Sequence, residues 1–181
     1  SLASRDIPSE GFRELVSLFA DIGKTEDFDL LHSSAFLKQR NVEDRNFVFK
    51  ELIRANQQRL VKPGKIRKSE LLKLLSSGNS IAAELCGSWK VVEAKQEIIE
   101  WLKNDERVEV AASSLSSMAD DESKQALMKL AEDERRKIHP RAAAVSALAK
   151  LDPVKTSELA AQVLVKAETA QSAELIFEVF L

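Results

Sequence analysis

The chain of 181 residues is poor in residues that break helices, form disulfides or favour strands. It contains one cysteine, five glycines, four prolines and no tyrosine. The single Cys86 excludes an internal disulfide and a metal site built from several cysteines. Strands would require more β-branched and aromatic residues and more turns, whereas alanine, leucine, glutamate and lysine are abundant. The composition therefore predicts an all-α chain with essentially no sheet.

The charges of the chain are nearly balanced. Its 27 basic and 29 acidic residues leave a formal net charge of −2, so no overall field attracts nucleic acid or anionic lipid. No apolar run is long enough to cross a bilayer, and the first eight residues lack the basic and apolar regions of a signal peptide. The sequence has no initiator methionine and stops within an apolar pattern. We therefore expect a segment of a longer protein, with no membrane insertion of the segment itself.

Three segments share one pattern of small residues followed by a large apolar anchor. They span residues 79–89, 108–118 and 141–151, and each precedes a second apolar helix pattern. A shift of 29 residues carries Trp89 onto Met118 and Trp101 onto Leu130, and a shift of 33 then carries Leu130 onto Val163. Units of this length are typical of helix-pair solenoids, in which stacked pairs share a continuous core.

Apolar residues at three- and four-residue steps predict the positions of the helices. In the first part of the chain we expect one helix that is capped by Ser9 and ends at Gly23. A second helix is expected from about Thr25 to Gln39, with a break near residues 32–34 as the alternative. A third is capped by Asp44 and ends before Pro63. The later helices are expected at residues 69–76, 80–89, 92–103, 108–118, 122–132, 140–151, 153–167 and from Ser172 onward.

These patterns divide the chain into two parts that together form one continuous array. Residues 1–61 do not superpose on the later units and are either degenerate repeats or an N-terminal cap, whereas residues 69–181 carry the repeats. The last predicted helix is crowded with apolar residues, namely Leu175, Ile176, Val179, Phe180 and Leu181. We expect this apolar edge to continue the array or to pair with a second copy.

The sequence offers little for catalysis, metal binding or cofactor binding. His32 and His139 have no second histidine or cysteine at ligand spacing, and no glycine-rich phosphate loop follows a strand. Cys86 lies in a helix expected to be buried, and the serines of residues 113–117 contain no nucleophile elbow. We therefore expect no catalytic, cofactor or metal residues. An enzyme such as a lyase would need a cleft that joins a histidine to acids and a nucleophile.

Basic residues cluster at two predicted joints between helices, near Pro63 and before Pro140. Brought to one edge, they could contact phosphate or an acidic protein surface. The candidate polyanion-binding residues are Arg59, Lys62, Lys65, Arg67, Lys68, Arg135, Arg136, Lys137 and Arg141. Acidic residues flank both clusters and no exposed aromatic residue is interleaved, so a solvated polar joint is the simpler interpretation and nucleic acid is not the favoured partner.

The unit at residues 127–153 resembles a HEAT-like repeat of the bacterial lyase-type class. In that class an apolar helix, a turn and an Arg-Ala-Ala helix ending in leucine recur, as they do here in Leu127–Glu132 and Arg141–Leu151. About 110 residues from Ser69 onward fit the resemblance, with Val108 in the place of the arginine in the preceding unit. Residues 158–181 are also similar to the repeat region of large bacterial proteins that carry membrane-bound-dehydrogenase-like and c-type haem domains. The chain itself has no haem attachment motif.

The resemblance implies an α-α superhelix of the HEAT/ARM-like solenoid type, built right-handed from antiparallel helix pairs. Such an array acts as a non-catalytic scaffold or spacer and mediates protein-protein interaction through one helix of each pair. We expect a protein partner or neighbouring domains of the parent chain. The alternative is a polyanion-binding or nucleic-acid-binding array that uses the basic joints.

Overall fold

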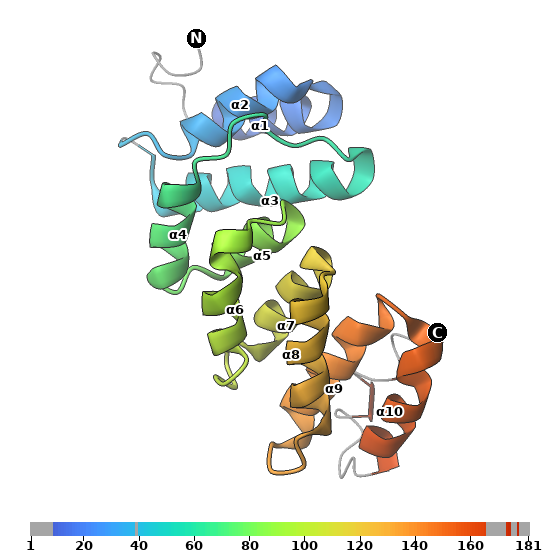
Figure 1. The fold of residues 1–181 in the computed structure, drawn as a ribbon. Coiled ribbons are helices and arrows are strands. Elements are labelled where there is room, and N and C mark those ends of the chain that lie inside the picture. The colour runs from blue at the N-terminus through green and yellow to red at the C-terminus, as the bar shows by residue number, and fades with distance from the viewer. Residues whose placement is uncertain (1–8, 39, 166–172, 175–176, 178–181) are drawn as a thin grey trace. The chain divides into compact units, whose positions relative to one another are not determined.

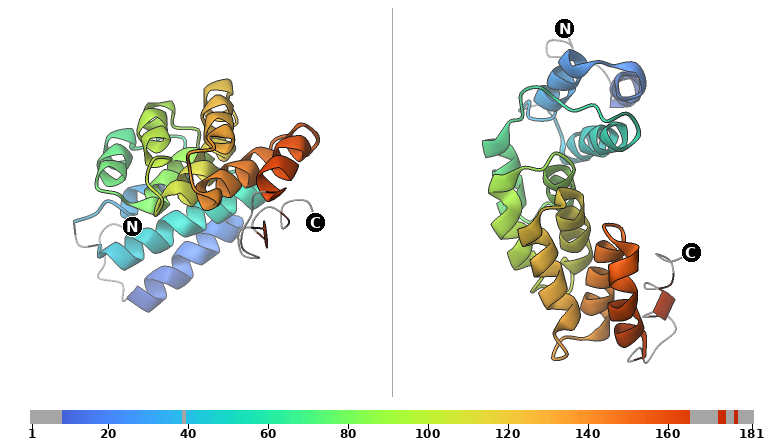
Figure 2. Two further views of the ribbon diagram at one scale, coloured as in Figure 1. Left: turned by 90° about the horizontal axis from the view of Figure 1, so that it is seen from below. Right: turned by 45° about the vertical axis from the view of Figure 1, so that its right-hand side comes forward.

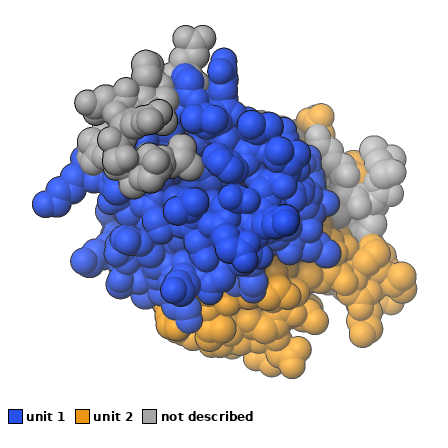
Figure 3. Space-filling model, turned by 90° about the horizontal axis from the view of Figure 1, so that it is seen from above, with its two compact units in different colours: residues 1–89 blue, residues 90–181 orange. Residues whose placement is uncertain are grey.

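The computed structural model describes residues 9–38, 40–165, 173–174 and 177 of the chain (Figure 1). Within these residues it contains ten α-helices, one short 3₁₀ turn and no β-strand, so the predicted all-α class is confirmed. The chain divides into two compact units, residues 1–89 and residues 90–181 (Figure 3). This division falls inside the stretch 69–181, which is predicted to form one run of repeats.

The first unit contains five helices. They are α1 (Ser9–Ile22), α2 (Thr25–Ser34), α3 (Val42–Arg59), α4 (Lys68–Ser76) and α5 (Ser80–Ser88). Helix α3 packs against α1, α2 and α5, and α1 and α3 lie side by side in Figures 1 and 2. Phe12, Phe28, Phe49 and Leu52 are fully buried and form much of the core.

Helices α1 and α3 run in the same direction. Near their N-terminal ends Arg13 Nε donates to Asp44 Oδ1 over 2.9 Å, and towards their C-terminal ends Arg54 Nη2 donates to Asp21 Oδ1 over 2.7 Å. Helix α5 follows α3 in the same sense, since Asn56 Nδ2 donates to Ser88 Oγ over 2.8 Å. Helices α1, α3 and α5 therefore form a parallel row, with α2 and α4 connecting them.

The second unit contains α6 (Lys95–Trp101) after the 3₁₀ turn η1 (Val92–Ala94), then α7 (Val108–Met118), α8 (Asp121–Glu132), α9 (Ile138–Ala149) and α10 (Pro153–Val165). Helix α7 packs on α9, and α8 contacts both α6 and α10. Ser116 Oγ donates to the Ala147 carbonyl over 2.8 Å, an approach that the small side chains of both helices permit. Met118, Leu127, Leu130 and Val163, which the repeat register predicts as anchors or core positions, are all buried.

Several predicted boundaries are wrong. Helix α2 ends at Ser34, where the alternative prediction has a break, and does not reach Gln39. The Ser34 hydroxyl donates to the Leu31 carbonyl, and the following amides form tighter three-residue turns. Asn41 caps α3 in place of Asp44: its side chain accepts from the Asp44 amide, while the Asp44 carboxylate is buried beside Arg13. Helix α3 does end before Pro63 as predicted: its last residue is Arg59, and Leu60 takes a left-handed conformation with φ 56°.

Helix α9 begins two residues before the predicted start at Pro140. Pro140 is its third residue, where the missing amide costs no helical hydrogen bond because the first-turn amides have no partner in the helix. Leu151 consequently falls after α9 and is only partly buried. Gln39, residues 166–172 and most of the predicted helix from Ser172 onward lie outside the described residues, as do Leu175, Ile176, Val179, Phe180 and Leu181 of the predicted apolar edge.

Candidate interaction surface

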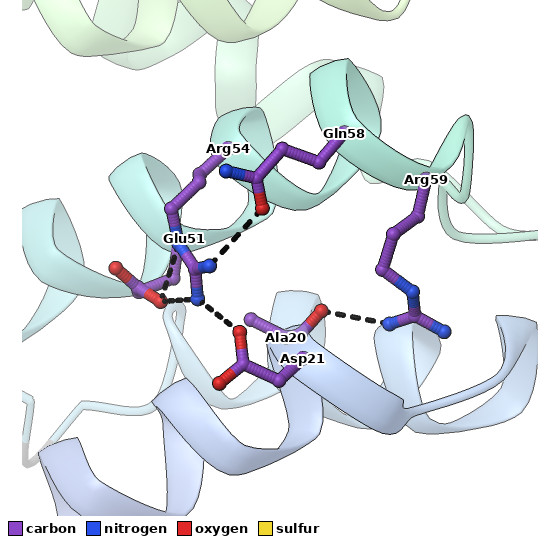
Figure 4. A network of polar contacts seen from close by, with 6 residues as sticks. All are labelled: Ala20, Asp21, Glu51, Arg54, Gln58 and Arg59. Carbon is purple, nitrogen blue, oxygen red and sulfur yellow. Dashed lines mark hydrogen bonds and ion pairs between the residues drawn. The ribbon is translucent and has the colours of Figure 1, made fainter.

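The basic residues of the first unit have different surroundings. Arg59 is partly buried, and its guanidinium donates to the Ala20 carbonyl (Figure 4) and to the Gly23 carbonyl, both over 2.7 Å, so that it caps the C-terminal end of α1. Arg67 pairs with Glu70 at 3.2 Å. The side chains of Lys62, Lys65 and Lys68 are exposed. Arg59 therefore has a structural role, while the lysines remain available to solvent.

The basic residues of the second unit are mostly engaged with acids or carbonyls. The Arg135 guanidinium forms two hydrogen bonds with Asp133, and Arg136 Nη2 lies 2.9 Å from Asp105 Oδ1. Lys137 lies 3.4 Å from the other oxygen of Asp105, so that Lys137 first and Arg136 second lower the pKa of this carboxyl.

Arg141 is 5% exposed and donates from Nε to the Ala131 carbonyl over 2.8 Å. It joins α9 to the end of α8. The Nε hydrogen bond therefore links the two helices, and little of the Arg141 side chain is exposed to solvent.

The two histidines lie in different surroundings. His32 is fully buried, and neither ring nitrogen has a hydrogen-bond partner. Its ring instead meets those of Phe36 and Trp89 edge-on, with centroids 5.3 and 5.0 Å away. His139 Nε2 lies 3.4 Å from Glu109 Oε1 on the surface of the second unit. In the described part of the chain, no three His, Cys, Asp or Glu side chains are grouped so that they could hold a metal ion.

The second unit has a groove between α6 and α8, called here the α6–α8 groove. It has a volume of about 490 Å³. Ile99, Leu102, Ala126 and Leu130 supply its apolar lining. Charged residues surround this lining, with Glu122 near the start of α8 and Lys103, Lys129, Asp133 and Arg136 near the ends of the two helices. The groove thus combines an apolar floor with a charged rim, as interfaces commonly do.

A second groove lies between α8 and α10, with its floor completed by the end of α9. This α8–α10 groove has a volume of about 380 Å³. Met128, Leu148, Leu151 and Leu159 supply its apolar lining. Met128 is 44% exposed. A flexible thioether at such a place adapts to varied contacts, which makes this the part of the unit best suited to hold a partner's apolar side chain.

The two grooves occupy equivalent positions of the repeat. The shift of 29 residues carries Ile99 onto Met128, and the shift of 33 carries Ala126 onto Leu159. The same register therefore places an apolar pair in each groove, one residue from each flanking helix. Sequence reasoning did not single out these residues. One feature of the sequence could have identified the groove: Met128 is an apolar residue among the polar and charged residues of the outer face of α8.

Comparisons with known proteins add no family to this description. The chain matches no protein-family model, no curated protein and no solved structure. Across the described residues, every helix is too short or too polar to cross a membrane.

Proposed function

We propose that this chain is a helical-repeat scaffold of the HEAT/ARM-like kind that binds a protein partner and catalyses no reaction. In such an array, helix pairs stack side by side and each pair contacts its neighbours along the chain. The bound partner lies on the row formed by the second helix of each pair, where α8 separates the two grooves.

One observation carries this proposal. Side-chain hydrogen bonds that join distant parts of the described chain span 26 to 39 residues, from Gln96 to Glu122 at one limit and from Arg59 to Ala20 at the other. The bond between Asn56 and Ser88 in the first unit and that between Ser116 and Ala147 in the second span 32 and 31 residues. Most of these side-chain hydrogen bonds therefore span about the length of one helix pair, which supports a stacked array in which each pair contacts the next along the chain.

The parallel rows support the same interpretation. In the first unit α3 packs between α1 and α5, which run in the same direction, and in the second unit α7 packs on α9. The helices between them carry the chain back to the start of the next helix in each row. On this view residues 1–61 contribute repeat-like pairs and are not a separate cap.

The polyanion-binding alternative has less support. Arg59 and Arg141 donate to backbone carbonyls, and four of the remaining candidates pair with acids, namely Arg67, Arg135, Arg136 and Lys137.

A capture experiment tests the proposal. The segment is used to capture proteins from lysate of the source cell, in parallel with Met128→Arg, which places a charge on the floor of the α8–α10 groove. Val154→Arg is the matched control, because Val154 is an apolar residue of the same unit that is 80% exposed and lines neither groove.

A third variant reverses the charges of Lys65, Arg67, Arg135 and Arg136. We expect the unmodified segment, the Val154 control and the charge-reversed variant to retain the same protein, and Met128→Arg to lose it. Nucleic acid recovered by the unmodified segment and lost on charge reversal would instead support the polyanion-binding array.

A further inference from the structure

His32 is an ionisable residue at a place that offers it no hydrogen bond. It lies on α2, its side chain is fully buried, and neither ring nitrogen has a partner. A neutral imidazole carries one N–H donor and one acceptor nitrogen, whereas the protonated ring carries two donors and a positive charge. Burial penalises the charged form far more than the neutral form. Protonation therefore favours any arrangement in which part of the cover over this ring moves and admits water.

Two aromatic rings form one part of this cover. The ring of Phe36, just after α2, and that of Trp89, at the end of α5, meet the His32 ring edge-on. Phe36 also contacts Phe49 of α3, with centroids 5.6 Å apart, and Trp89 is only 3% exposed. Moving either ring would expose large apolar side chains of the core to water. This part of the cover is therefore costly to open.

The segment between α3 and α4 forms another part of the cover. This α3–α4 connector, residues 60–67, lies against α2 (Figure 1). Its Lys65 amide donates to Asp29 Oδ1 over 2.8 Å, and Asp29 precedes His32 by three residues, so that both lie on one face of the helix. The charge of Arg67 in the connector also acts on His32. The connector thus covers the face of α2 that carries the histidine.

The α3–α4 connector is held less firmly than the rings. It contains no helical turn, and Pro63 is its buried side chain. Its exposed residues are Leu60, Lys62, Gly64, Lys65 and Arg67. Segments with few buried side chains and a solvent-exposed backbone open locally at a lower free energy than the core. Movement of the connector away from α2 is therefore the least costly way to hydrate His32.

The charged groups near His32 do not offset its burial. Burial is the main cause that lowers the pKa of His32 from 6.5 to about 4, and the charge of Arg67 adds to it. Asp29 on α2 and Glu70 on α4 act in the opposite direction. Arg67 and Glu70 also pair with each other at 3.2 Å, so their effects on the ring oppose each other. The aromatic rings that meet His32 carry no charge.

We propose that the α3–α4 connector is a strap that closes over His32, and that protonation of this histidine opens it while the helices of the first unit remain folded. In the open form both ring nitrogens reach water, which supplies the hydrogen bonds that the closed form lacks. The inference concerns the first unit and goes beyond the proposed binding of a partner by the second.

Hydrogen exchange of single backbone amides, followed by NMR on the full chain, tests this switch. The protection factor of the Lys65 amide reports opening of the connector, because this amide is bound to Asp29 in the closed form. A ring with a pKa of about 4 when closed and 6.5 when open raises the open population about twentyfold between pH 7 and pH 5. We expect the protection factor of Lys65 to fall by this factor. In His32→Phe, which has no titrating ring, it should change by less than about twofold.

Urea distinguishes this local opening from unfolding of the first unit. The Leu52 amide lies in the core helix α3, where exchange requires unfolding. Its protection factor should therefore fall as urea is added below the unfolding transition. A local opening exposes little new surface and responds weakly to urea. We expect the protection factor of Lys65 to stay nearly constant over the same urea concentrations at both pH values.

Three results would overturn the inference: no effect of pH at Lys65, an equal effect in His32→Phe, or parallel urea slopes for Lys65 and Leu52. Asp29→Asn and Glu70→Gln keep the test decisive if His32→Phe does not fold. Each removes one carboxylate near His32, and asparagine retains an oxygen that can accept from the Lys65 amide. The effect of pH should persist in both variants, and its loss in either would assign the switch to that carboxylate.

Discussion

The imidazole ring of His32 meets the indole ring of Trp89 edge-on, with centroids 5.0 Å apart and planes at 81°. Both rings are buried, and neither His32 nitrogen nor the indole nitrogen of Trp89 has a hydrogen-bond partner. Burial lowers the pKa of His32 from 6.5 to about 4, with a further contribution from the charge of Arg67, while the carboxylates of Asp29 and Glu70 oppose the shift. The histidine is therefore neutral in the folded protein near neutral pH.

This contact predicts a pH-dependent stability. Between pH 6.5 and about 4 the unfolded chain binds a proton at His32 and the folded chain does not, so the free energy of unfolding falls as pH falls through this window. The loss amounts to about 3 kcal/mol over the whole window. We expect His32→Phe to remove this contribution. Urea unfolding of both proteins at pH 7 and pH 4.5 measures it as the difference between their two pH slopes, and equal slopes would contradict the assignment.

Arg59 connects the ends of α1 and α3 through the carbonyl of Ala20, which Figure 4 shows, and that of Gly23. Lysine has one ammonium group and cannot reproduce the planar fork that reaches both. We expect Arg59→Lys to lower the free energy of unfolding by about 1–3 kcal/mol, the cost of leaving a carbonyl without its charged donor. Arg135→Lys is the control at a 90% exposed side chain and should change stability by less than about 0.5 kcal/mol. Similar urea midpoints for the two variants would show that Arg59 does not link these helices.

Helix α9 packs against α7, α8 and α10, and Ala144 on this helix is fully buried. A larger side chain there has no room and forces the neighbouring helices apart. We expect Ala144→Leu to lower the free energy of unfolding by about 1–3 kcal/mol. Lys150→Leu, at an exposed position just after the same helix, should leave stability within about 0.5 kcal/mol of the unmodified protein. Thermal unfolding of the two variants measures this difference, and equal midpoints would show that the surroundings of Ala144 have room for a larger side chain.

The sequence predicted much of the local structure. The helix at residues 108–118 agrees at both ends, and α10 begins at the predicted residue 153, where the Asp152 side chain accepts from the Lys155 amide. These features depend on periodicity, capping and proline chemistry, which are local. The repeat register also placed Trp101, Leu130 and Val163 correctly in the core, because burial of equivalent positions follows from the shared pattern.

The features that the sequence missed depend on residues distant along the chain. Arg141 resembles a surface cation in sequence, and only the position of the Ala131 carbonyl shows that it bonds the end of α8. His32 lies among serines in sequence, while its ring contacts Trp89 from another helix. The grooves likewise require both the register of the repeats and the exposure of Met128, which the pattern of apolar residues alone does not supply.

Site-specific photo-crosslinking in the source cell tests most directly whether the grooves beside α8 form the binding surface. A photoreactive phenylalanine derivative replaces Met128 in the α8–α10 groove, Val154 outside both grooves, or Lys65 in the basic joint of the first unit. We predict one discrete protein adduct from position 128 and none from positions 154 and 65. An adduct from position 65 with none from position 128 would contradict the account and place the functional surface at the basic joint.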